Sequence, residues 1–136
     1  MQNIQLLLRK DLYRRALEVH LQSLEEFHRI VRDISGDACP IGPLAPEFKS
    51  PEKNMFSCLF LSVILHLFKE SAFIPLYAFI NQCMRAWVTG CDNLLDDEYK
   101  TIFPFAIKEK GSRIPSVFTL LLTDRALTRF MTEKFN

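Results

Sequence analysis

The sequence predicts an all-α fold, and three observations lead to that prediction. Apolar residues recur at three- and four-residue steps over long stretches, and no stretch shows the sustained polar–apolar alternation of a half-buried strand. The chain of 136 residues is 49% hydrophobic and 24% charged, the profile of a globular domain or of a piece of a larger one. Its 12 Phe residues indicate thick, mutually packed helices, because large rings are stabilised mainly by leaving water. We therefore expect a helical bundle over residues 1–136.

The first helix is expected over residues 4–34. Its apolar residues fall on one face, and Gly36 offers a stop. A break or kink is expected near Arg14 and Arg15, where the apolar spacing changes register. The segment 36–50 contains three prolines and cannot continue a helix.

Three further helices follow from the same reasoning. Ser50 and Pro51 predict the start of a helix over 51–69, and its apolar character on nearly every side predicts a central position. Pro75 opens a helix expected over 75–100. After a loop, the last helix is expected over 116–134. The buried stripe of the 75–100 helix is expected to consist of Ile80, Met84, Trp87, Cys91 and Leu95.

Composition limits the classes of function. The net charge of +1 provides no general field for a phosphate polymer, so nucleic acid is not an expected partner. The four cysteines form no CxxC pair, which predicts reduced thiols in a cytoplasmic protein. The longest apolar run, 55–68, is shorter than the roughly 20 residues of a membrane span, so no transmembrane segment is expected.

A cluster of acids stands at the C-terminal end of the 75–100 helix. Asp92, Asp96, Asp97 and Glu98 lie where the helix dipole disfavours each anion by about 0.3–1 kcal/mol. Asp92 and Asp96 are one turn apart and project together, so we expect them to face one cavity, with Cys91 and Leu95 turned into the core. Two such carboxylates suit Mg²⁺, which completes its shell with water and phosphate oxygens. The alternative is a solvated acidic helix end balanced by Lys100, Lys108 and Lys110.

The stretch CDNLLDDEYK, residues 91–100, resembles the first aspartate-rich motif of class I isoprenoid synthases. In that family a helix ends in DDxxD or, in the squalene and phytoene synthases, DxxxD. This chain has DxxxDD, with Asn93 at the second position of DDxxD, so the reaction subtype stays open. More loosely, SPEKNMFSCLFLSV, residues 50–63, resembles the helix that begins with a diphosphate-contacting lysine, and Lys53 is the matching residue.

A third segment extends the resemblance downstream. GSRIPSVFTLLLTDRALTRF, residues 111–130, is similar to the prenyltransferase segment in which a basic loop and a proline lead into a helix with a Gly-Asp pair. Thr123 replaces that glycine, and Asp124 keeps the acid. The chain therefore resembles the N-terminal half of a class I isoprenoid synthase, an incomplete bundle of that type.

The resemblance implies a cavity in which Mg²⁺ bridges Asp92 and Asp96 to the diphosphate of a prenyl substrate. Metal-assisted loss of diphosphate would then generate a carbocation. Lys53 becomes a candidate diphosphate contact by the same resemblance. Lys110 and Arg113 flank the loop after the acidic motif, where they either clamp a diphosphate or belong to a solvated loop.

Two further charged residues are candidates for the site. Arg85 falls seven residues before Asp92, nearly on its face, and either orients a carboxylate or lies exposed. Asp124 lies on an apolar stripe, where burial without a partner would be costly. It is expected to pair with Arg125, Arg129 or a neighbouring helix, or to act near the metal.

Class I synthases resemble one another in facing the first acidic motif with a second one across the cavity, and this sequence contains no second motif. We therefore expect the chain alone to be inactive, and to oligomerise or require a missing C-terminal half or partner chain. The alternative class is a non-catalytic helical interaction or regulatory subunit derived from a synthase.

Overall fold

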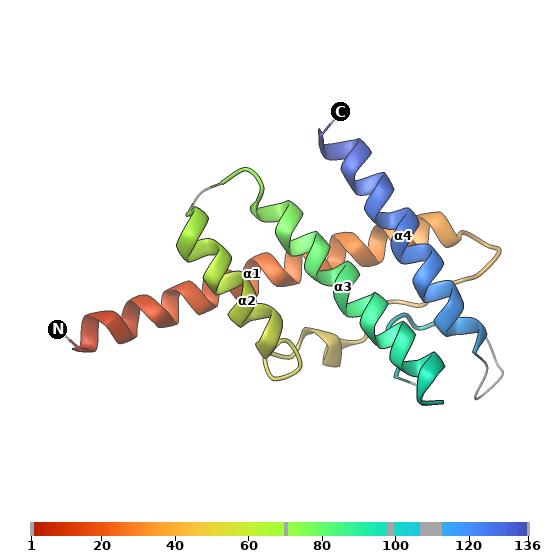
Figure 1. Cartoon of the computed structure of the whole chain (residues 1–136), viewed down its shortest axis with the longest axis horizontal. Helices are drawn as coiled ribbons and strands as arrows, with labels where there is room; N and C mark the ends of the chain where they lie inside the picture. The colour runs from red at the N-terminus through yellow and green to blue at the C-terminus, as the bar shows by residue number, and fades with distance from the viewer. Residues whose placement is uncertain (1, 70, 98–99, 107–112, 136) are drawn as a thin grey trace. The chain divides into compact units, whose positions relative to one another are not determined.

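The computed structural model describes residues 2–69, 71–97, 100–106 and 113–135. Their regular structure is helical apart from one isolated antiparallel bridge, so the all-α prediction is confirmed (Figure 1). None of the described helices combines the length and apolar character that crossing a bilayer demands. The elements are α1 (Gln2–Ser35), the short 3-10 helix η1 (Pro46–Lys49), α2 (Met55–Phe68), α3 (Ile74–Leu95) and α4 (Ile114–Phe135).

Helix α1 runs through Arg14 and Arg15 without interruption, so the expected break there is wrong. Gly36 ends it with a φ of 52°, and its N–H donates to the carbonyl oxygen of Arg32 at 3.0 Å. This left-handed conformation is open to glycine because it has no Cβ.

Helices α2 and α3 are shorter than their apolar patterns predict. Residues 51–54 form a turn before α2, and the Asn54 amide donates to the carbonyl oxygens of Phe48 and Ser50 at 2.7 and 2.9 Å. Helix α3 ends at Leu95 rather than at 100, and Asp97 adopts a φ of 55° just beyond it.

The chain forms two compact units, residues 1–24 with 45–81 and residues 25–44 with 82–136. In the first unit, one side of α2 packs into a buried apolar cluster, and its opposite side is exposed. The expected central position of α2 is therefore wrong, because a cluster of this size covers one helical face. The cluster consists of Ala16, Leu61, Leu65, Ile74 and Ala78, with Leu12 and Val19 packed against it.

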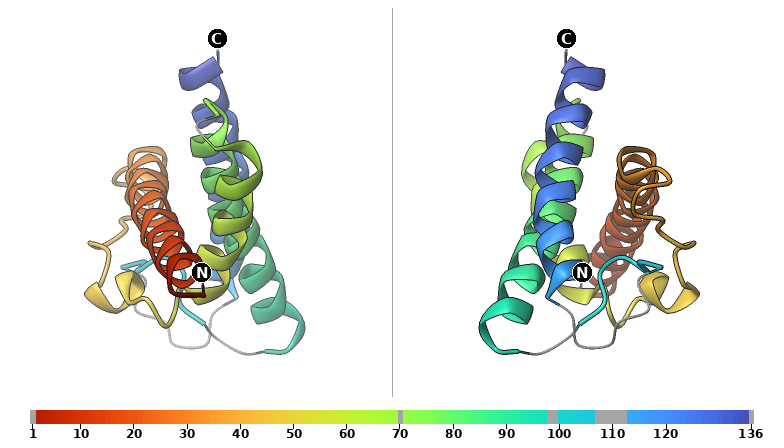
Figure 2. Two further views of the ribbon diagram at one scale, coloured as in Figure 1. Left: turned by 90° about the vertical axis from the view of Figure 1, so that its left-hand side faces the viewer. Right: turned by 90° about the vertical axis from the view of Figure 1, so that its right-hand side faces the viewer.

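In the second unit, α4 runs beside the C-terminal part of α3 (Figures 1 and 2). The two helices approach closely at Gly90, where an added Cβ would stand 2.9 Å from Cδ2 of Leu120 and 3.6 Å from the carbonyl oxygen of Ser116. A residue larger than glycine would have to displace the leucine side chain. The close approach therefore depends on Gly90.

A chain of aromatic rings joins three segments of the second unit. The ring of Phe103 lies 5.4 Å from that of Phe27 on α1 and 5.9 Å from that of Phe105, centroid to centroid. Phe105 in turn lies 6.4 Å from Phe118 on α4. These separations fall in the range of favourable aromatic contacts, so the 103–105 segment bridges α1 and α4.

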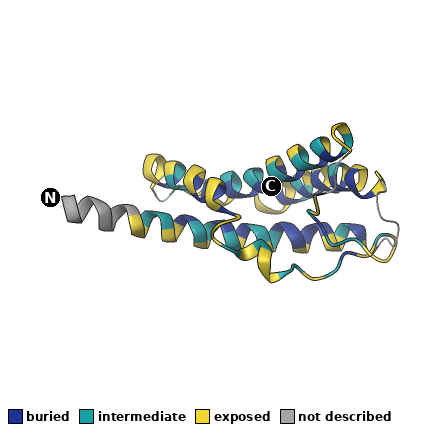
Figure 3. Ribbon diagram, turned by 90° about the horizontal axis from the view of Figure 1, so that it is seen from below, coloured by how far each residue is buried: buried dark blue, intermediate teal, exposed yellow. Residues whose placement is uncertain are grey.

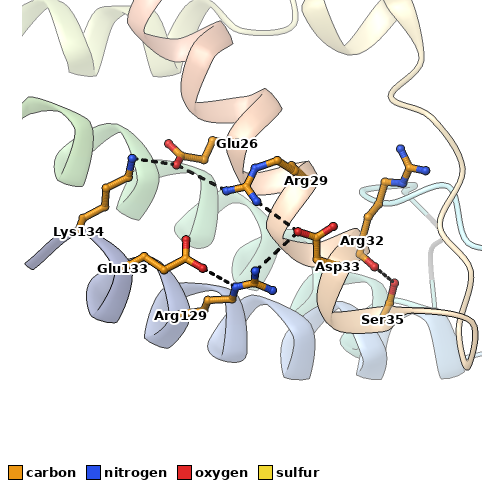
Figure 4. Close-up of polar contacts among 8 residues, drawn as sticks. All are labelled: Glu26, Arg29, Arg32, Asp33, Ser35, Arg129, Glu133 and Lys134. Carbon is orange, nitrogen blue, oxygen red and sulfur yellow. Dashed lines mark hydrogen bonds and ion pairs between the residues drawn. The ribbon is translucent and has the colours of Figure 1, made fainter. Parts of the chain in front are cut away.

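Charged side chains add a second connection between α1 and α4 (Figure 4). Arg129 pairs with Asp33 at 3.7 Å and with Glu133 at 2.7 Å, and Lys134 reaches Glu26 at 3.3 Å. The pairs are partly exposed, so they define the mutual register of the two helices more than they stabilise the fold.

The buried side of α3 differs from the stripe that the sequence predicts. Met84, Cys91 and Leu95 are exposed, and Ile80 and Trp87 are only partly buried, so the predicted stripe is wrong. Buried and exposed positions alternate along the helices of the chain (Figure 3). In the first unit the inner face of α3 carries Ile74, Ala78 and Phe79. In the second unit it carries small or polar side chains instead, and at Gly90 the close approach leaves no room for a larger one. Within the second unit this face consists of Gln82, Cys83, Ala86, Gly90 and Asn93.

Candidate functional site

The acid pair lies at the end of α3 in the second unit. Asp92 is half-buried in the last turn, and Asp96 follows Leu95, the last helical residue. The N–H of Asp96 donates to the carbonyl oxygen of Asp92 at 2.9 Å, which keeps the two residues one helical turn apart. Neither carboxylate has an ion pair or hydrogen bond from another described side chain. That both face one cavity stays a prediction.

Asn93 holds the segment that follows the acid pair. Its Nδ2 donates to the carbonyl oxygen of Lys100 at 2.9 Å, and its Oδ1 accepts from the N–H of Lys100 at 2.9 Å. The side chain is only 5% exposed. Both the NH₂ group and the oxygen of the Asn93 amide are used. These two hydrogen bonds hold the backbone of Lys100 against the end of α3.

The role of Asn93 gives a physical reason for the departure from DDxxD. A carboxylate at this position could accept from Lys100 but could not donate to its carbonyl oxygen, and its charge would be buried. The asparagine is therefore a structural requirement of this helix end. We had not predicted this residue, although a side chain able both to donate and to accept near a helix end is a usable signal.

Arg113 reaches the acidic segment from the start of α4. Its Nη2 lies 3.5 Å from Oδ1 of Asp97, and both side chains are largely exposed. The carbonyl oxygen of Arg113 accepts from the N–H groups of Ser116 and Val117, so the residue also starts the helix. The structure thus brings one predicted diphosphate contact to the acidic segment, but pairs it with Asp97 rather than with Asp92 or Asp96.

The remaining candidates are placed as follows. Arg85 is half-buried on α3, and its Nη1 donates to Oε1 of Gln82 at 3.4 Å. Lys53 lies in the first unit, with its amino group 5.6 Å from the centre of the Phe48 ring. Asp124 is exposed and forms no ion pair with another described residue, and Arg129 pairs with other acids. The expected pairing with Arg125 or Arg129 is therefore wrong, and a role of Asp124 near the metal stays a prediction. Lys110 lies outside the described residues.

Large apolar side chains border the acid pair on the outer face of α3. Leu95 is 82% exposed, and Val88 and Met84 lie two and three turns before it on the same side. The prediction that Cys91 and Leu95 turn into the core is therefore wrong, because the inner side of the last turn is occupied by Asn93. The outer face of α3 combines apolar surface with two acids at one end.

The donor set of the acid pair suits a hard cation in part. Mg²⁺ takes one or two protein carboxylates and fills its remaining positions with water and phosphate oxygens. Among the residues that the structure covers, no group of three or more His, Cys, Asp or Glu side chains could hold a metal. The pair would therefore supply only part of a shell, and oxygen ligands from outside the described residues would have to supply the rest.

Two buried groups of the second unit are held in their neutral forms. Burial, reinforced by the nearby Arg32, lowers the pKa of His28. Burial likewise raises the pKa of Cys83 to about 12. Neither group forms an ion pair or hydrogen bond with Asp92 or Asp96.

Comparison of the chain with protein-family models, with characterised proteins and with solved structures gives no match.

Proposed function

We propose that the end of α3 forms one wall of a Mg²⁺–diphosphate site and that the chain is part of an isoprenoid synthase. The observation that carries the proposal is the pair Asp92 and Asp96, one helical turn apart and without a cationic partner among the described residues. Like charges at the negative end of a helix dipole repel, and a bound cation would relieve that cost. Resemblance of the 91–100 segment to the first aspartate-rich motif supplies the reaction class.

The outer face of α3 supports a substrate that is charged at one end and apolar along its length. The acids lie at one end of the face, and the exposed side chains of Val88 and Leu95 lie beside them. A prenyl diphosphate has this distribution of charge. Bound Mg²⁺ would stabilise the negative charge that develops on the leaving diphosphate.

The other candidates receive supporting roles in this proposal. Arg113 would exchange its contact with Asp97 for a diphosphate oxygen, which a guanidinium binds in a bidentate manner. Lys110 would add a point charge, and Arg85 would orient Asp92. That Lys53, which belongs to the first unit, contacts the diphosphate stays a prediction. Since the acid pair supplies only part of the metal shell, we propose that activity requires ligands from a missing C-terminal half or a partner chain.

Calorimetry with inorganic diphosphate tests the proposal. The chain should bind diphosphate in the presence of Mg²⁺ and not in the presence of EDTA. Asp92→Asn and Asp96→Asn should each abolish the Mg²⁺-dependent heat, because each removes a ligand. Asp37→Asn is the matched control, since it removes an exposed acid elsewhere in the same unit and should leave binding unchanged. Binding that is equal in all four proteins would exclude the acid pair as the site.

A second candidate function is a non-catalytic interaction or regulatory subunit. The observation that favours it is the extent of exposed apolar surface on α2, α3 and α4, which suits helical partners. This alternative predicts no Mg²⁺-dependent diphosphate binding, alone or with a partner. The same calorimetric experiment therefore separates the two functions.

A further inference from the structure

Helix α2 carries a continuous row of large apolar side chains on its outer side. The members fall on one side of the helix, since apart from the neighbours Leu59 and Phe60 they are three or four residues apart, and each is between 45% and 81% exposed. They lie opposite Ser57, Cys58 and Leu61, the buried side of the helix. We call this set the outer row of α2; it consists of Phe56, Leu59, Phe60, Val63 and Leu67.

The row is firmly held within the first unit. Asn54 fixes the start of α2 through two hydrogen bonds to backbone oxygens, and the N–H of Lys69 donates to the carbonyl oxygen of Leu65 at the other end. Leu61 and Leu65 anchor the inner side in the buried cluster. The outer row is therefore a fixed feature of the folded unit, with a defined spacing that a partner helix could match.

The chemistry of the row specifies its partner. Helix α2 contains no Asp, Glu, Lys or Arg, so a partner gains nothing from charge along the row. The exposed area of the row is about 600 Å², and two copies face to face would bury about 1,200 Å², the lower end of the range for stable interfaces. A ridge of side chains at this spacing packs best against another helix.

We propose that the outer row of α2 pairs with the same row of a second copy of this chain, in antiparallel orientation. A two-fold axis between Phe60 and Val63 sets the bulky Phe56 of one copy against Leu67 of the other, and the reverse. Antiparallel pairing also brings the exposed Glu52 and Lys53 of each copy towards Lys69 of the other, whereas parallel pairing would bring the two Lys69 residues together. The proposal does not involve Asp92 or Asp96 and is independent of the proposed function.

Light scattering coupled to size exclusion tests the proposal. The chain should elute with twice its mass of 15.8 kDa and dissociate on dilution. The double substitution Phe60→Glu and Val63→Glu should give a monomer with an unchanged helical circular-dichroism spectrum, because both side chains are exposed. Leu121→Glu is the matched control: this leucine is 59% exposed on α4, outside the row, and the dimer should persist.

The orientation is tested without altering the row. Glu52→Lys should weaken the dimer at least threefold at low salt, and Lys69→Glu in the same chain should restore it. A monomeric parent chain would overturn the proposal, and the partner of the outer row would then have to be a different protein. A dimer that survives Phe60→Glu with Val63→Glu, or that is lost with Leu121→Glu, would also overturn it. If the pair of charge substitutions fails to restore association, the antiparallel arrangement is wrong.

Discussion

The two faces of α3 within the second unit are built from opposite kinds of side chain. The inner face presents Cys83, Ala86, Gly90 and Asn93, all buried, whereas Met84 and Leu95 on the outer face are exposed. A simple amphipathic helix would place the larger apolar groups inside. Here the distance to the neighbouring helix selects small side chains for the inside, and the large groups are left for the outside.

The two faces of α3 are therefore expected to have different roles, the inner face in stability and the outer face in binding. The inner face determines stability through close packing at Gly90 and through the two hydrogen bonds of Asn93. The outer face carries the acid pair and apolar surface. The acids have no ion pair with other described residues, and the apolar side chains are exposed. Substitutions on the inner face should therefore change the free energy of unfolding, and substitutions on the outer face should change binding or activity.

The largest effect is expected for the acids of the outer side. In the active assembly, Asp92→Asn or Asp96→Asn should lower turnover by several orders of magnitude, because the metal loses a charged ligand. The helical circular-dichroism signal should stay nearly unchanged, since each substitution relieves repulsion at the helix end. Steady-state diphosphate release measures the first quantity. Activity within about twofold of the parent in both variants would contradict the assignment.

Thiol reactivity gives the next largest contrast between the two faces. Cys91 is exposed, whereas burial raises the pKa of Cys83 from its ordinary value of 9.0 to about 12. Burial and the raised pKa both lower the reactivity of Cys83, so the exposed Cys91 should be alkylated at least about a hundredfold faster in the folded protein. Timed iodoacetamide labelling with peptide mass spectrometry measures the ratio. Equal rates in the folded state would show that the inner face is open.

The same thiol predicts a loss of stability at alkaline pH. The pKa of the Cys83 thiol is higher in the folded state, so the unfolded chain loses the thiol proton at a lower pH. The contribution of Cys83 to the free energy of unfolding is therefore complete below pH 9.0 and is lost as the pH rises towards 12. Urea titrations over this range should show the decline. Cys83→Ala should reduce its slope, whereas Cys91→Ala should not.

Asn93→Asp tests the polar part of the inner face. At neutral pH the introduced carboxylate cannot donate to the carbonyl oxygen of Lys100 and buries a charge, so the free energy of unfolding should fall by about 1–3 kcal/mol. Acidification should narrow the difference, since the protonated carboxyl can donate again. The control is Asp92→Asn at the neighbouring position, where the side chain is only half-buried. It should change the free energy of unfolding by less than about 0.5 kcal/mol. Equal effects at both positions would remove the distinction between the faces.

Gly90→Ala should give the smallest effect. The added methyl group would lie 2.9 Å from Cδ2 of Leu120, so the leucine side chain would have to shift. The free-energy cost of that shift should outweigh the gain in helix propensity, and the free energy of unfolding should fall by about 1 kcal/mol or less. In a Leu120→Ala background the same change should be stabilising by up to about 1 kcal/mol. Chemical denaturation of the four proteins measures the reversal of sign. If Gly90→Ala stabilises the parent chain as well, the two helices are not in close contact there.

The helical positions could be predicted because their signals are local. Proline at 75 and 115 and glycine at 36 act within one turn of the backbone, and they locate the limits of α1, α3 and α4 to within a few residues. The spacing of Asp92 and Asp96 is equally local, and the hydrogen bond between their backbones shows it. Interactions of this range need no knowledge of neighbouring helices.

Which face of each helix is buried could not be predicted in the same way. Periodicity identifies an apolar face but does not state that a second element covers it, so the stripe with Met84, Cys91 and Leu95 was assigned to the interior. Helix α2 was assigned a central position for the same reason, although its outer row is exposed. The contact of Asp97 with Arg113 joins residues from different elements and has no local signal.

The sequence by itself determined the helical class of this protein, the order of its helices and the one-turn spacing of its acid pair, because backbone preferences and helical geometry act between near neighbours. Only the tertiary structure decided which faces are buried, since that depends on how closely two helices approach. Gly90 allows α3 and α4 to meet over small side chains, and Asn93 uses its inward position to hold Lys100. The large apolar groups and the acids are consequently left on the outside, where a metal, a substrate or another chain can reach them.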